Sequence, residues 1–141
     1  MYRNVLVATD LSPDTSDVIG RAGAIAGDAK VAIAHVIEPL ALAYGAEMPV
    51  DLAALQEEIS RQARRKLDEV ADRLGIAAED RLLVTGTISR EILRIARERG
   101  TDLIVIGSHS RRGLASLLGS TANAVLHHAP CDVLAVRIAT H

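Results

Sequence analysis

The sequence predicts an α/β protein built on an open, five-stranded parallel sheet with helices on both faces. Three observations lead to this fold class. Short runs of aliphatic and β-branched residues, continuous rather than alternating, are typical of strands buried on both faces. Longer segments carry apolar residues at helical spacing. Five such strands and four such helices alternate along the 141 residues, and this alternation favours a parallel sheet.

The first strand is expected over residues 2–9, a continuous apolar run. Ser12 followed by Pro13 is typical of a helix start. The serine hydroxyl can cap the helix, and proline is tolerated at the first helical position because an N–H there would have no partner within the helix. We therefore expect the first helix over 13–26, where Gly27 ends it. Its inward residues are expected to be Val18, Ala22, Ile25 and Ala26.

Residues 30–36 form the second expected strand, and a loop of low charge over 38–50 leads to a long helix over 51–74. Asp51 stands at its expected N-cap. Its inward residues are expected to be Leu52, Leu55, Ile59, Leu67, Val70 and Leu74. Its outer face mixes both signs of charge, which indicates a solvated face rather than an anion site. That face carries Arg61, Arg64, Arg65, Lys66, Asp68 and Glu69.

Three more strands are expected over 81–85, 103–106 and 132–138. Helices fill the two gaps between them, one starting near Ser89 and one running from Ser120 to about residue 129. The inward residues of these helices are expected to be Ile92, Ile95, Ala96, Ala122, Val125, Leu126 and Ala129. No linker or repeat divides residues 1–141, so we expect a single domain.

The composition excludes several classes of protein. A net charge of -2 argues against nucleic-acid binding, which usually needs a basic face. With two tyrosines as the only aromatics, the chain has little to stack on a flavin or on single-stranded nucleic acid. The one cysteine, Cys131, indicates a reducing compartment and is interpreted as a small core residue. No signal segment or membrane span is recognisable, so we expect a cytoplasmic protein with no membrane partner.

The candidate site lies where polar turns follow the strands. Asp10 to Pro13 follow the first strand and Gly107 to Gly113 follow the fourth. Ligands of open parallel sheets bind beyond the carboxyl ends of strands, where the strand order reverses. Gly119, Ser120 and Thr121 then start the last helix, where free N–H groups and the helix dipole favour an anion such as phosphate.

The chain resembles the universal stress protein family over essentially its whole length. The segments that carry the resemblance are NVLVATDLSP, AHVIEP, LIVIGSHSRRG and LLGSTANAVLHHAPCDVLAVR. The resemblance implies a Rossmann-like sheet (the adenine nucleotide alpha hydrolase-like type) with strand order 3-2-1-4-5. It also implies a cytosolic homodimer that acts in the stress response, with unknown protein partners. Members of the family often dimerise through the last strand, here residues 132–138.

Family members that bind ATP carry Gly-x-x-Gly, nine residues, and then Gly with Ser or Thr. Matching this pattern makes Gly107 the first glycine and Gly119-Ser120 the closing pair. The resemblance also places Asp10 near the adenosine and Val36 beside the adenine. The candidate nucleotide-binding residues are therefore Ala8, Thr9, Asp10, Val36, Gly107, His109, Ser110, Arg111, Arg112, Gly119, Ser120 and Thr121.

Two departures from the family pattern leave the ligand open. Ser110 replaces the second glycine, and eight rather than nine residues separate it from Gly119. Glycine at such a position usually serves a positive φ or a close approach of backbone to ligand. One hypothesis is a regulator that binds ATP or another adenine nucleotide, with Mg²⁺ accompanying it. The alternative is a dimer that binds no nucleotide and acts through protein contacts.

Catalytic and metal motifs are missing from the sequence. It contains no nucleophile elbow, no lysine after Gly119-Ser120 and no paired carboxylates at a recognisable spacing. We therefore expect no catalytic residues and at most slow ATP hydrolysis. His127 and His128 suit the dipole at the end of the last helix, and no third ligand makes them a metal set.

Overall fold

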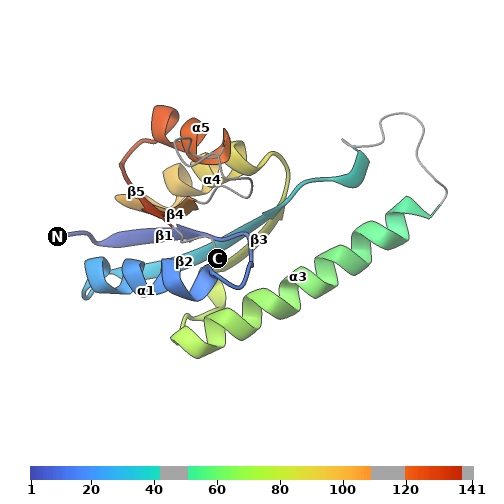
Figure 1. Cartoon of the computed structure of the whole chain (residues 1–141), viewed down its shortest axis with the longest axis horizontal. Coiled ribbons are helices and arrows are strands. Elements are labelled where there is room, and N and C mark those ends of the chain that lie inside the picture. Colours follow the sequence, from blue (N-terminus) through green and yellow to red (C-terminus); the bar gives the residue numbers. More distant parts are fainter. Residues whose placement is uncertain (42–50, 109–119, 138–141) are drawn as a thin grey trace.

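A computed structural model describes residues 1–41, 51–108 and 120–137. Its centre is a five-stranded sheet in the order β3-β2-β1-β4-β5, and every pair of neighbouring strands is parallel (Figure 1). The predicted fold class and the strand order implied by the family are both confirmed. The strands are β1 (Asn4–Ala8), β2 (Lys30–Ile37), β3 (Arg81–Thr85), β4 (Leu103–Ser108) and β5 (Asp132–Arg137).

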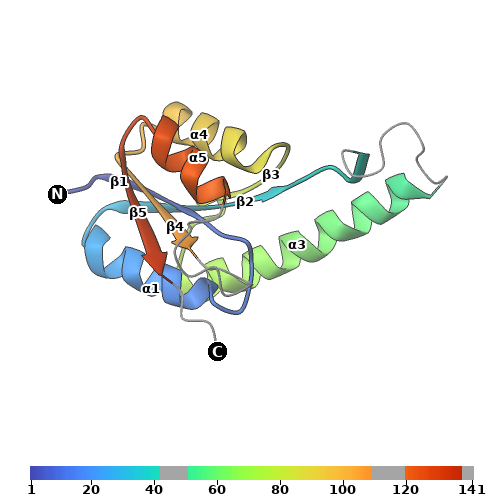
Figure 2. The ribbon, with the colours of Figure 1, turned by 45° about the horizontal axis from the view of Figure 1, so that its top comes forward.

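Helices cover both faces of the sheet. Helices α1 and α3 lie on one face, and α4 and α5 lie on the other (Figures 1 and 2). In β1, Val5 and Val7 pack with α1, whereas Leu6 between them packs with α4 and α5. Because alternate residues enter two different cores, the strands are continuously apolar. The helices are α1 (Thr15–Ala26), α3 (Leu52–Leu74), α4 (Ile88–Glu98) and α5 (Ser120–His128), with a short 3₁₀ turn, η1 (Ala78–Asp80).

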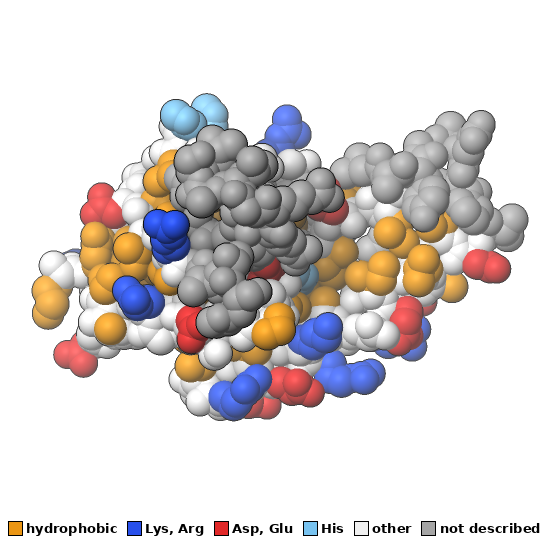
Figure 3. Space-filling model, viewed as in Figure 1, with side chains coloured by type: hydrophobic (Ala, Val, Ile, Leu, Met, Phe, Trp, Pro, Cys, Tyr) orange, Lys and Arg blue, Asp and Glu red, His pale blue; other side chains and the backbone are white. Residues whose placement is uncertain are grey.

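Helix α3 is the longest element and extends past the sheet. Its 23 residues span about 35 Å, and its amino-terminal half reaches beyond the other elements (Figures 1 and 2). Basic and acidic side chains alternate over its outer surface (Figure 3). This agrees with the predicted solvated face. No helix in the described ranges is long and apolar enough to cross a membrane.

For four residues, the prediction that the side chain faces inward is wrong. Ile25, Leu55, Leu74 and Leu126 are 45%, 49%, 43% and 40% exposed. Ile25, Leu74 and Leu126 lie in the last turns of their helices, on the exposed side. Leu55 lies on the part of α3 that extends beyond the sheet. Helical spacing predicts a face and does not tell how far along a helix that face stays covered.

Several predicted boundaries also move. Helix α1 begins at Thr15, two residues after the predicted start, and its N-cap residue is Asp14 rather than Ser12. Strand β4 runs on through Gly107 to Ser108, because both residues continue the pairing with β5. Asp51 does take the N-cap position of α3, although its side chain makes no capping hydrogen bond.

Candidate functional site

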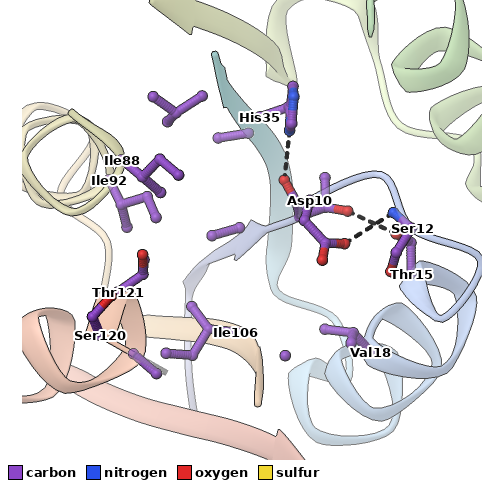
Figure 4. A pocket seen from close by; sticks show the side chains of 16 residues that line it. Asp10, Ser12, Thr15, Val18, His35, Ile88, Ile92, Ile106, Ser120 and Thr121 are labelled. Carbon is purple, nitrogen blue, oxygen red and sulfur yellow. Dashed lines mark hydrogen bonds between the residues drawn. The ribbon is translucent and has the colours of Figure 1, made fainter. Parts of the chain in front are cut away.

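A pocket of about 280 Å³ lies at the carboxyl ends of β1, β2 and β4, beside the first turns of α1, α4 and α5 (Figure 4). Strand β1 is paired with β2 on one side and with β4 on the other. The chain therefore leaves β1 in one direction and later returns to its opposite edge. This is the switch point at which open parallel sheets bind their ligands.

The β1–α1 turn forms one wall of the pocket. The Oδ1 atom of Asp10 accepts a hydrogen bond of 2.9 Å from the backbone N–H of Ser12. Leu11, between them, has a φ of 60°, which is the left-handed region. Such a conformation costs a non-glycine residue about 1–2 kcal/mol, so the surrounding hydrogen bonds must hold it. This turn also delays the start of α1, which explains why the predicted start was too early.

Thr9 lies at the centre of that hydrogen-bond network. Its N–H donates to the carbonyl oxygen of Ala34 over 2.9 Å, which carries the β1–β2 pairing one residue further. Its Oγ1 accepts from the N–H of Leu11 at 2.9 Å and lies 2.8 Å from Oγ1 of the buried Thr15. Its carbonyl oxygen lies 2.8 Å from Nδ1 of His35. The position of Asp10 is thus fixed from β1, β2 and α1 together.

Aliphatic side chains make up most of the remaining wall. They come from six strands and helices that the sequence separates widely: β1, α1, β2, α4, β4 and α5. In Figure 4, Ile88 and Ile92 lie on the opposite side of the pocket from the Asp10 turn, and Ile106 lies on the pocket wall near α5. A mainly apolar lining with a few fixed polar groups is typical of small-molecule sites. The aliphatic lining consists of Ala8, Val18, Ala34, Val36, Ile88, Ile92, Ile106 and Ala122.

The first turn of α5 closes the pocket. Ser120 and Thr121 line it together with Ala122, and their side chains are drawn beside Ile106 in Figure 4. The first N–H groups of a helix have no partner within the helix. Together with the helix dipole they favour a negatively charged group at this end of the pocket.

Seven of the predicted site residues lie around this one pocket. Five others fall outside the described residues: His109, Ser110, Arg111, Arg112 and Gly119. The seven that the structure brings together are Ala8, Thr9, Asp10, Val36, Gly107, Ser120 and Thr121.

Sequence reasoning missed the other lining residues. One signal was available, because His35 is a polar residue inside an apolar strand run. Thr15 and Ser12 stood in the predicted helix start, and Ile92 was assigned only to the core. The missed residues are Ser12, Thr15, Val18, Ala34, His35, Ile88, Ile92, Ile106 and Ala122.

Metal ligands do not gather in the described ranges, where no group of three His, Cys, Asp or Glu side chains is placed to hold an ion. His127 and His128 have ring centroids 6.5 Å apart at the end of α5. Of the pocket's polar groups, those of Thr9, Asp10 and His35 are tied into the turn.

The model of the universal stress protein family matches residues 1–137. The chain belongs to this family. Among individual universal stress proteins, homolog 1 of universal stress protein A from Coxiella burnetii is 39% identical over 138 residues, which cover 96% of each chain.

Solved structures of universal stress proteins share the fold. One from Lactobacillus plantarum has a TM-score of 0.75 and is 25% identical, covering 96% of this chain and 98% of its own. Another, solved in complex with cAMP, has a TM-score of 0.63 and is 29% identical, covering 98% of each chain.

Proposed function

We propose that this universal stress protein is a cytosolic regulator that binds ATP or another adenine nucleotide in the pocket at the switch point of its sheet. The observation that carries the proposal is the pairing of two halves in one cavity. An aliphatic slot and the first turn of α5 lie next to each other in the lining of the same cavity. A base and a phosphate need these two environments at the two ends of one molecule. The family member in complex with cAMP supports the same ligand class.

Each part of the nucleotide has a matching part of the pocket. The base fits between Val36 and the two isoleucines of α4, Ile88 and Ile92. Asp10 lies across the pocket from Ile88 and Ile92 (Figure 4), where its carboxylate can accept a hydrogen bond from a ribose hydroxyl. The phosphates belong at the N-terminus of α5, with Ser120 and Thr121 as donors. Mg²⁺, where present, would be held by the phosphate oxygens and water.

We propose a binding role rather than a catalytic one. The polar groups of the β1–α1 turn are engaged in holding the backbone, since Thr9 and Asp10 both accept hydrogen bonds from it. Ligand binding would then stabilise one conformation of the site, and ATP hydrolysis would be slow at most. A protein partner would recognise and bind that conformation.

Calorimetric titration with ATP, ADP, AMP and cAMP tests the proposal. The nucleotide-stripped protein should bind at least one of them at a single site. Ser120→Ala removes one donor to phosphate and should weaken ATP binding about tenfold, the usual effect of losing a hydrogen bond to a charged group. Ser89→Ala is the matched control, because Ser89 lies in the first turn of α4 and outside the pocket lining. It should leave the affinity unchanged.

Absence of heat with all four nucleotides would favour the second candidate function, a dimer that acts without nucleotide. The sequence observations behind that candidate are Ser110 and the shortened spacer before Gly119. Equal weakening by Ser89→Ala and Ser120→Ala would instead contradict the placement of the phosphates at α5.

We also propose a homodimer formed through β5. This strand ends the sheet next to β4, and it contains no proline or lysine that would discourage pairing with another chain. Residues Val133 to Ala135 are half-buried, so pairing would cover apolar side chains as well as backbone groups. Light scattering on a gel-filtration column should give twice the monomer mass at micromolar concentration. A monomer mass throughout a dilution series from 100 to about 1 μM would contradict the proposal.

A further inference from the structure

His35 is a polar residue in an otherwise buried, apolar stretch of β2. Its neighbours Ala34 and Val36 are buried on the α4 side of the sheet, while the imidazole lies at the pocket above the Asp10 turn (Figure 4). Nδ1 of His35 is 2.8 Å from the carbonyl oxygen of Thr9. A carbonyl oxygen can only accept a hydrogen bond, so Nδ1 must carry the hydrogen and donate it.

This contact fixes the imidazole at Nδ1, and its acceptor is itself held in place. The backbone of Thr9 is held to β2 by its N–H, and the Thr9 hydroxyl is held by Leu11 and Thr15. The acceptor of the His35 hydrogen bond is therefore a rigid part of the site. A recognition group that is already oriented loses little conformational entropy when a ligand binds.

We infer that Nε2 of His35 is the acceptor of a hydrogen bond from the bound nucleoside. In a neutral imidazole with hydrogen on Nδ1, Nε2 carries the lone pair. Within the described ranges, the one hydrogen bond of His35 is the one to Thr9. Two nucleoside groups have this donor chemistry: the 6-amino group of adenine and a ribose hydroxyl. The inference rests on the proposed function and makes His35 a specificity-determining residue of the same pocket.

The free protein offers a first test without ligand. Long-range ¹H–¹⁵N correlation spectra should show the neutral ring of His35 with its hydrogen on Nδ1 and none on Nε2. A neutral ring with its hydrogen on Nε2 would overturn the inference before any nucleotide is added.

Two substitutions separate ligand recognition from support of the turn. The side-chain nitrogen of Asn lies as many bonds from Cβ as Nδ1 does in His. His35→Asn therefore keeps a donor for Thr9 and removes Nε2, whereas His35→Ala removes both. His35→Asn should keep the wild-type melting temperature and bind ATP roughly three- to tenfold more weakly, as expected for one lost hydrogen bond. Wild-type affinity in His35→Asn would overturn the inference and leave a purely structural role for His35.

Nucleotide analogues identify the donor. ITP lacks the 6-amino group, and 2′-deoxy-ATP and 3′-deoxy-ATP each lack one ribose hydroxyl. The analogue that lacks the relevant donor should bind the wild type more weakly than ATP does. It should bind His35→Asn as tightly as ATP binds that variant, since the hydrogen bond is already lost there. If His35→Asn weakens the binding of every analogue by the same factor as it weakens the binding of ATP, Nε2 does not contact the nucleoside. If the wild type binds no adenine nucleotide, the proposed function itself fails, which this series distinguishes from a failure at His35.

Discussion

Asp102 connects the starts of β1 and β4 through its side chain and its backbone. Its two carboxylate oxygens accept the N–H groups of Arg3 at 2.8 Å and Asn4 at 3.0 Å. Its own N–H donates to the carbonyl oxygen of Asn4 at 2.9 Å. These contacts hold the pKa of the Asp102 carboxyl below its ordinary value, with the hydrogen bond from Arg3 as the largest cause. The charged form of Asp102 is therefore part of what aligns the two central strands.

The lowered pKa makes stability depend on pH with a definite sign. Because the folded-state pKa is below the unfolded value, the contribution of Asp102 is full above the unfolded pKa of about 4 and disappears as pH falls through the folded pKa. Asp102→Asn should therefore lower the free energy of unfolding at pH 7, and the difference from wild type should shrink toward pH 2. Urea unfolding of both proteins across this range measures it. A difference that stays constant down to pH 2 would show that the charge is not involved.

At the scale of elements, Gly75 ends α3 in a Schellman motif. Gly75 has a φ of 68°, and its N–H donates to the carbonyl oxygen of Asp72 at 3.2 Å. The N–H of Ile76 donates to the carbonyl oxygen of Ala71 at 3.0 Å, and both side chains are buried in the core on this face. The chain can therefore turn from the helix directly back toward the sheet.

Two glycine substitutions should have opposite signs. Gly75→Ala places a Cβ in the left-handed region and should cost about 1–2 kcal/mol of unfolding free energy. Gly20→Ala lies inside α1, where a new Cβ meets nothing within 4 Å, and should stabilise by about 0.5–1 kcal/mol. Chemical denaturation measures both. Destabilisation by both variants in equal measure would mean that something other than backbone conformation decides the cost.

The elements also show what the sequence predicts well. Strands were predicted almost to the residue at β2 and β3, because apolar runs bounded by glycine or polar residues are unambiguous. The start of α1 was wrong because Ser12-Pro13 is a good local start signal, yet Asp10 and Leu11 form a turn first. Local propensity could not reveal that tertiary contacts to Thr15 and β2 hold this turn.

At the scale of the whole molecule, the strand order brings the site together. Periodicity predicts the strands but not their neighbours, so the order 3-2-1-4-5 came from the family resemblance. Once β1 lies between β2 and β4, Asp10, Val36 and Gly107 must converge at one edge of the sheet. The aliphatic half of the pocket was not predicted, because Ile88 and Ile92 look like ordinary inward residues of a helix.

The structure also contains a second hollow that serves as an internal control. It has a volume of about 430 Å³ and lies between the β1–α1 turn and α3, where Lys66 and Arg73 are part of its lining. It shares Ser12 and Thr15 with the site pocket. A nucleotide attracted only by positive charge would not distinguish the site pocket from this hollow, whose lining also contains Glu69.

The most direct test of adenine-nucleotide binding is a ¹H–¹⁵N amide titration of the protein with ATP. Binding at the switch point should give saturable shifts centred on Thr9, Val36, Gly107 and Thr121, the four walls of the site pocket. Shifts confined to Lys66 and Arg73, or no saturable shifts at millimolar ATP, would contradict it.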